Sequence, residues 1–156
     1  MQSKTMEHIG YLVNGLTILV YFGLLFILDT HPALAFLRYL GFILFAVGIL
    51  LIILSIMALR RDQTGTVISS GAFAVVRHPM YLGSIFLFIS MSCFLPHWIM
   101  VVLSTLNFII IYRFMVEGEQ QNLEKFGEAY ARYMEVVPRA NLFTGFIRLL
   151  QRKRKA

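Results

Sequence analysis

The chain carries four long apolar runs that contain almost no charge. They cover residues 9–28, 39–59, 81–95 and 98–114, and within them only Arg113 is charged. A helix of about 20 apolar residues crosses the roughly 30 Å hydrocarbon core of a bilayer. The first two runs reach this length, whereas the third and fourth, at 15 and 17 residues, are short for a span. The sequence therefore predicts four transmembrane helices, two of which are tilted or shielded by the others.

The last two runs are separated only by Pro96 and His97, which predicts a helical hairpin over residues 81–114. Of the 156 residues, 58% are hydrophobic and 14% charged, compared with about 45–50% apolar and about 25% charged in soluble proteins. This composition excludes a disordered chain, and it excludes a nucleic-acid partner although the net charge is +6. We predict one all-α, polytopic integral membrane domain over residues 1–156, in contact with membrane lipid.

The lysines and arginines gather at one side of the predicted helices. Of the 14 such residues, only Arg38 lies between the first and second runs. The positive-inside rule therefore places both termini and the loop 60–80 in the cytoplasm. This topology corresponds to the inner membrane of a bacterial cell or the endoplasmic reticulum of a eukaryotic cell, and we expect any chemistry on the cytoplasmic side.

Residues 116–156, which follow the fourth run, are polar and are predicted to form a cytoplasmic helix and a basic amphipathic tail. Apolar residues recur in the tail at helical spacing, at positions Phe143, Phe146, Ile147 and Leu150. Four basic residues follow at 152–155. The tail is either an amphipathic helix lying on the membrane surface or a basic terminus that only confers solubility.

The loop before the third run contains a first candidate site, Arg77-His78-Pro79. Proline suits the first turn of a helix, and the partial positive charge of a helix N-terminus adds to the guanidinium of Arg77 to favour an anion. His78 can carry a proton or donate a hydrogen bond, and Tyr81 faces roughly the same side. Alternatively, Arg77 and Tyr81 only anchor the chain at the membrane interface.

The segment after the fourth run contains a second candidate site, centred on Glu119. At 100° per residue, Glu119 falls on the apolar stripe of a helix extended through this segment. The other members of the stripe are Leu123, Phe126, Tyr130 and Tyr133. A carboxylate on an apolar face needs a cation, a ligand hydroxyl or an ammonium group as partner. The aromatic residues either pack the helix or contact a ligand, and Tyr130 is the one contact we predict.

Three motifs occur in order: residues 77–83 (Arg-His-Pro-Met-Tyr-Leu-Gly), then Glu119 followed by residues 126–130 (Phe-Gly-Glu-Ala-Tyr), then residues 137–139 (Val-Pro-Arg). Together they resemble the isoprenylcysteine carboxyl methyltransferase family over about residues 65–140. That family usually has paired glutamates where this chain has Gly118-Glu119, so only Glu119 is carried over. The resemblance implies an integral membrane enzyme that uses S-adenosylmethionine, bound between the loop before the hairpin and the helix after it.

The resemblance implies a cofactor site formed by Arg77, His78, Tyr81, Glu119 and Tyr130. Arg77, His78 and Glu119 are the expected catalytic residues, with Glu119 accepting hydrogen bonds from the cofactor. We assign no metal. The resemblance implies a lipophilic methyl acceptor and favours a carboxylate. Such an acceptor is already ionised at pH 7 and needs no base.

Three alternatives stay open at this point. The first is a phospholipid or other small-molecule N- or S-methyltransferase of the wider superfamily. In such an enzyme, an amine acceptor would need a base. The second is a glutathione-conjugating four-helix membrane enzyme, and the third is a non-enzymatic membrane adaptor. The sequence does not predict the oligomeric state.

Overall fold

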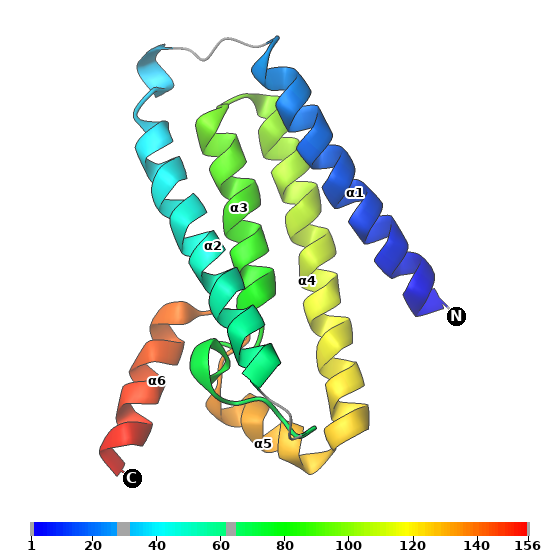
Figure 1. Cartoon of the computed structure of the whole chain (residues 1–156), viewed down its shortest axis with the longest axis vertical. Helices are drawn as coiled ribbons and strands as arrows, with labels where there is room; N and C mark the ends of the chain where they lie inside the picture. The colour runs from blue at the N-terminus through cyan, green and yellow to red at the C-terminus, as the bar shows by residue number, and fades with distance from the viewer. Residues whose placement is uncertain (1, 28–31, 62–64, 156) are drawn as a thin grey trace. The chain divides into compact units, whose positions relative to one another are not determined.

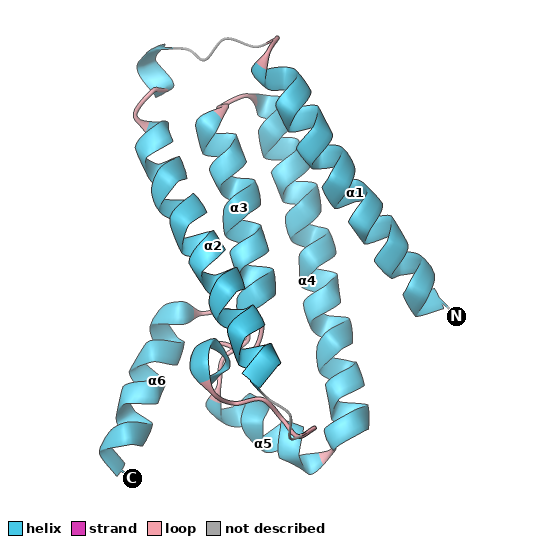
Figure 2. Cartoon of the chain, viewed as in Figure 1, coloured by secondary structure: helices cyan, strands magenta, loops and turns pink. Residues whose placement is uncertain are grey.

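The computed structural model describes residues 2–27, 32–61 and 65–155. Within these residues the chain forms six α-helices and two short 3-10 helices, with no strand (Figures 1 and 2). The elements are α1 Gln2–Leu25, η1 Pro32–Leu34, α2 Leu37–Arg61, η2 Gly71–Ala74, α3 Pro79–Phe94, α4 Trp98–Phe126, α5 Glu128–Val136 and α6 Leu142–Lys155. The predicted all-α fold is confirmed.

Among the described residues, two helices are long and apolar enough to cross a membrane, α2 with 25 residues and α4 with 29. The apolar part of α1, Leu12–Leu24, and the apolar helix α3 are shorter. The predicted spans 39–59 and 98–114 therefore lie in helices of sufficient length, while the spans 9–28 and 81–95 stay predictions. Leu28 lies outside the described residues.

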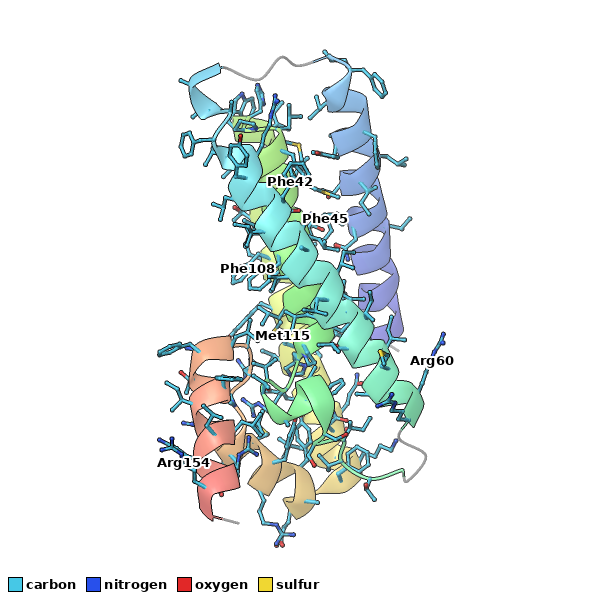
Figure 3. All side chains as sticks on the ribbon, turned by 60° about the vertical axis from the view of Figure 1, so that its left-hand side comes forward. Phe42, Phe45, Arg60, Phe108, Met115 and Arg154 are labelled. Carbon is cyan, nitrogen blue, oxygen red and sulfur yellow. The ribbon has the colours of Figure 1, made fainter. Side chains whose placement is uncertain are left out.

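Apolar side chains on the long helices are exposed, as expected for surfaces that face lipid. Phe42 and Phe45 stand out along α2, and Phe108 does so on α4 (Figure 3). The basic residues of α2 lie at its ends, with Arg60 and Arg61 in the last turn. The chain belongs in a membrane, because water would leave these side chains hydrated at a large cost.

Helix α4 continues well past the predicted end of the fourth span at residue 114 and stops at Phe126. Gly127 then adopts a positive φ of 55°, and α5 begins at Glu128. This backbone conformation suits glycine, which has no Cβ, and it ends the helical hydrogen-bonding pattern. The prediction of one extended helix that carries the stripe from Glu119 to Tyr133 is therefore wrong, since Tyr130 and Tyr133 lie on a separate helix.

The chain divides into two compact units. The first comprises Met1–Gly48 and Ser84–Phe114, and the second comprises Ile49–Gly83 and Met115–Ala156. In the first unit, the hydroxyls of Ser92 and Ser104 lie 2.7 Å apart and join α3 to α4. The predicted hairpin is thus formed by α3 and α4.

Buried polar contacts also join α4 to α1 within the first unit. Asn107 Nδ2 donates to Thr17 Oγ1 over 2.8 Å, and both side chains are almost fully buried. In a membrane such contacts between helices replace the hydrophobic driving force that lipid does not supply.

In the second unit, main-chain hydrogen bonds join the start of α3 to the segment after α5. Arg77 N donates to the carbonyl of Pro138 over 3.0 Å, and His78 N donates to that of Arg139 over 3.2 Å. Pro79 is the first residue of α3, as predicted. Two segments about 60 residues apart in sequence are therefore held in fixed register, and all candidate site residues lie in this unit.

Candidate functional site

Glu119 is a buried carboxylate on α4, 4% exposed, surrounded by three nitrogen-bearing side chains. Arg139 donates to it twice, from Nε to Oε1 over 3.0 Å and from Nη2 to Oε2 over 2.6 Å. Arg77 Nη2 lies 3.3 Å from Oε1, and His78 Nε2 lies 3.2 Å from the same oxygen. The partner that a carboxylate on an apolar face requires is therefore supplied by the protein's own cations.

The contact with Glu119 determines the tautomer of His78. An ionised carboxylate only accepts hydrogen bonds, so Nε2 of His78 carries the proton and Nδ1 remains the acceptor. Burial lowers the pKa of His78 below the ordinary histidine value, an effect that the nearby Glu119 carboxylate opposes only in part. With His78 neutral at pH 7, Arg77, Arg139 and Glu119 together carry one net positive charge.

Arg139 is the member of this cluster that was not predicted as a site residue. It follows Val137, which is fully buried, and the main-chain bonds to residues 77 and 78 direct the segment toward Glu119. The planar guanidinium matches both oxygens of the carboxylate. The available signal was its place in the Val-Pro-Arg motif, combined with the requirement that the buried Glu119 be paired.

The guanidinium of Arg77 is only partly satisfied. Its side chain is 10% exposed, yet among the described residues Nε and Nη1 have no hydrogen-bond partner. A buried donor without a partner costs about 1–3 kcal/mol. These two N–H groups are therefore suited to receive an acceptor from a ligand, and their positive charge favours an anionic one.

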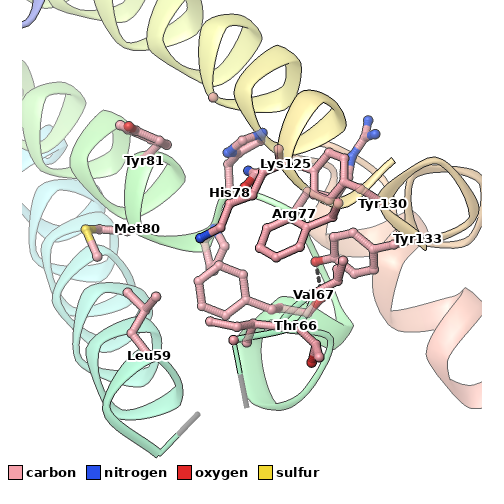
Figure 4. Close-up of a pocket in the computed structure, with 17 residues that line it drawn as sticks. Leu59, Thr66, Val67, Arg77, His78, Met80, Tyr81, Lys125, Tyr130 and Tyr133 are labelled. Carbon is pink, nitrogen blue, oxygen red and sulfur yellow. Dashed lines mark hydrogen bonds between the residues drawn. The ribbon is translucent and has the colours of Figure 1, made fainter. Parts of the chain in front are cut away.

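Arg77 lies in the wall of a cavity of about 540 Å³, within the range of about 300–1,000 Å³ typical of small-molecule sites. Leu59 and Met80 lie on one side and Tyr130 and Tyr133 on the other (Figure 4). The remaining lining residues are Gly65, Thr66, Val67, Ile68, Phe73, His78, Pro79, Tyr81, Gly118, Asn122, Lys125 and Phe126. The lining is largely apolar and aromatic, with Arg77, His78 and Lys125 as its basic groups.

The structure brings four of the five predicted cofactor residues to this cavity: Arg77, His78, Tyr81 and Tyr130. The fifth, Glu119, is not among the described residues that line it, and instead contacts Arg77 and His78. The structure thus groups the predicted residues in two layers. Arg77 and His78 border the cavity, and Glu119 holds them.

Tyr130 and Tyr133 form an aromatic wall, with ring centroids 5.6 Å apart. Tyr133 donates its hydroxyl to the carbonyl of Phe73 over 2.6 Å, shown as a dashed line in Figure 4. Burial raises the pKa of both phenols, so they stay protonated donors at neutral pH. Tyr133 also packs with Val137 and Val67, so it has the packing role considered for the aromatic stripe.

In the described part of the chain, no group of three or more histidine, cysteine, aspartate or glutamate side chains is placed to hold a metal ion. The site instead combines a cavity with a buried, partly unsatisfied guanidinium in its wall. Together with the apolar helices, these features describe a membrane protein with a cavity of small-molecule size.

The phospholipid methyltransferase family model matches residues 36–129, or 94 of the 156 residues. The chain therefore belongs to the phospholipid methyltransferase family, and the membrane methyltransferase resemblance drawn from its motifs is confirmed. The matched range includes Arg77, His78 and Glu119, and it ends one residue before Tyr130. No curated protein and no solved structure is significantly similar to the chain.

Proposed function

We propose that this protein transfers a methyl group from S-adenosylmethionine to a lipophilic acceptor, with a carboxylate as the favoured acceptor. The observation that carries the proposal is the Arg77 guanidinium, which borders the cavity with two donors that have no partner among the described residues, while its Nη2 contacts Glu119. Membership of the methyltransferase family supplies the reaction class.

The residues present fit this cofactor. Arg77 Nε and Nη1 suit its carboxylate, and the N-terminus of α3 at Pro79 adds partial positive charge at the same place. The aromatic side chains of Phe126 and Tyr130 offer flat apolar surface for an adenine ring. When bound, S-adenosylmethionine supplies an activated methyl group on a sulfonium centre.

Glu119 has a different role in this proposal from the direct ligand contact expected from the sequence. Both of its carboxylate oxygens already accept hydrogen bonds from Arg139. We therefore assign Glu119 as a positioning residue that orients Arg77 and fixes the proton of His78 on Nε2. Preorganised groups of this kind cost no rearrangement when the reaction occurs.

The side chains of the cavity contribute by orienting the reactants and by excluding water. A carboxylate acceptor is attracted by the net positive charge of the cluster, and it needs no base because it is already ionised. Held by Arg77 and the aromatic side chains of the cavity, S-adenosylmethionine would supply its methyl group to the acceptor oxygen, and the electron pair of the carbon–sulfur bond would remain on sulfur. No proton needs to move in this direct displacement.

A second candidate is N-methylation of a phospholipid amine, and two observations favour it. The matching family model is that of phospholipid methyltransferases, and neutral His78 borders the cavity with Nδ1 as an acceptor nitrogen. His78 would then take the proton of the ammonium before transfer. The glutathione-conjugating and adaptor alternatives do not account for the family membership.

The topology belongs to the same proposal. We propose that both termini and the loop 60–80 face the cytoplasm, which gives the cavity access to a soluble donor. A reporter enzyme that works only in the cytoplasm is expected to be active when it is fused to the C-terminus.

The acceptor is tested with purified protein in lipid nanodiscs and S-adenosylmethionine labelled in its methyl group. Label recovered in base-labile form on an S-prenylated cysteine analogue supports carboxyl methylation, since methyl esters hydrolyse in base. Base-stable label on phosphatidylethanolamine favours the amine alternative. No transfer to either class, or to total membrane lipid, would contradict the proposed function.

A further inference from the structure

Helix α6 packs against the rest of the second unit through the face that carries Gly145 and Arg152. Gly145 is buried, and a Cβ atom there would collide with the carbonyl oxygen of Val75. Arg152 Nη2 donates to the carbonyl of Ala74 over 2.7 Å. One face of α6 therefore rests directly on the main chain at residues 74 and 75, two residues before Arg77.

The opposite face of α6 is apolar and exposed. Phe143 is 78% exposed and Phe146 is 56% exposed, and Ile147 and Leu150 are also exposed. At 100° per residue these four side chains fall within an arc of about 100°, and both Gly145 and Arg152 lie roughly opposite Phe143. A helix on a water-soluble protein turns its apolar stripe inward. Helix α6 does the reverse, which indicates an apolar medium on its outer side.

The exposed face is continuous with apolar surface of α2. A groove of about 550 Å³ is lined by Leu51 and Leu54 of α2, by Ala72 and Val75 near η2, and by Leu142, Phe143 and Phe146 of α6. Since α2 is one of the two helices suited to cross a membrane, the lipid that surrounds α2 is the natural occupant of this groove.

The charge of α6 points to the same occupant. Arg148 is bonded to the carbonyl of Glu135, while Arg154 is exposed near the C-terminal end of the helix (Figure 3). Basic residues beside an apolar face are typical of helices that lie in the interface of anionic membranes. Together these features favour a bilayer over a protein partner.

We propose that α6 is a membrane-associated helix whose apolar face meets lipid. Its side chains Phe143, Phe146, Ile147 and Leu150 insert into the acyl-chain region, while Gly145 and Arg152 hold the main chain that leads to Arg77. The bilayer here supports the protein and is not the methyl acceptor, so the inference does not depend on the proposed function. Its consequence is that membrane attachment of α6 braces the loop that presents Arg77.

Depth-dependent spin labelling of the full chain tests this inference. A nitroxide is attached to Phe146→Cys or Gln151→Cys in a Cys93→Ser background, in vesicles of phosphatidylcholine and phosphatidylglycerol at a ratio of roughly 3:1. We expect the label at 146 to collide several-fold more with oxygen than with a water-soluble nickel chelate, and the label at 151 to show the reverse. Equal access of the nickel chelate to both positions would overturn the proposal. A label at 146 that collides with neither oxygen nor the chelate would also overturn it.

A second variant keeps an aromatic side chain at the inserted position, so that folding is least disturbed. Phe146→Trp is made in a Trp98→Phe background, which removes the one native tryptophan. Its fluorescence is expected to be strongly quenched by lipids brominated high in the acyl chain. Fluorescence that is unchanged by brominated lipid and quenched by aqueous iodide would refute insertion.

Discussion

Arg139 binds Glu119 through two parallel hydrogen bonds, with Nη2 2.6 Å from Oε2 and Nε 3.0 Å from Oε1. Arg77 and His78 contact the same Oε1 that accepts from Arg139 Nε. The bidentate pair also fixes the segment after α5 against α4. The pair therefore links the Val-Pro-Arg segment at residues 137–139 to Arg77, which borders the cavity.

Replacing Glu119 by glutamine keeps the shape of the side chain and removes the charge that the two arginines need. Because Arg77 then stays buried without a counter-charge, we expect Glu119→Gln to lower the free energy of unfolding by roughly 3 kcal/mol. Denaturant unfolding in detergent measures the change. The matched control is Glu117→Gln on the same helix, where we expect less than about 0.5 kcal/mol. Equal losses of unfolding free energy in Glu119→Gln and Glu117→Gln would contradict the central role of Glu119.

Replacing Arg139 by lysine keeps the charge and removes the planar fork. Lysine cannot form both bonds to Glu119 at once, so we expect Arg139→Lys to cost about 1 kcal/mol of stability. Arg132→Lys, at an exposed position on α5, serves as control. The midpoint temperature of thermal unfolding is measured for both variants. An unchanged midpoint for Arg139→Lys would count against the bidentate pair.

The buried His78 makes stability depend on pH. Because its pKa is lowered in the folded protein, the unfolded chain binds more protons below about pH 6.5. His78 therefore lowers stability as the pH falls from 7.5 through 6.5, by at most about 1.4 kcal/mol per pH unit. His78→Gln is expected to have a flatter stability profile between pH 7.5 and 5.5 than the wild-type protein. Parallel profiles would show that His78 does not titrate in this way.

Adding a methyl group at Gly145 tests how α6 is held. The new Cβ would collide with the Val75 carbonyl, so we expect Gly145→Ala to destabilise the protein by about 1–3 kcal/mol. Gly15→Ala on α1 is the control, because its Cβ would meet no atom within 4 Å. Hydrogen exchange of α6 and of residues 71–77 is expected to rise in Gly145→Ala alone. Unchanged exchange there would refute the close contact.

The sequence predicts the helices and part of the site because both follow from local pattern. The apolar runs required helices, and the carboxylate of Glu119 on an apolar stripe required a partner. The end of α4 was missed because Gly127 by itself does not reveal a positive φ. Arg139 was missed because its position depends on main-chain bonds to residues 77 and 78, which no spacing in the sequence reveals.

The orientation of α6 could not be predicted for a similar reason. Its amphipathic spacing showed that one face is apolar, but it did not show which face meets the protein. The close approach of Gly145 to Val75 and the bond from Arg152 to Ala74 are tertiary contacts. These contacts turn the apolar face of α6 away from the protein, whereas a helix on a protein in water turns that face inward.

The most direct test of the central claim is calorimetric titration of the protein in nanodiscs with S-adenosylhomocysteine. We predict saturable binding to the wild-type protein, weakened at least tenfold in Arg77→Ala, since a hydrogen bond to a charged group contributes about 1.5–3 kcal/mol. Arg113→Ala, outside the cavity lining, should bind as the wild-type protein does. No heat at millimolar ligand, or equal affinity in Arg77→Ala, would contradict the assignment of Arg77 as the anion-binding group of a methyltransferase site.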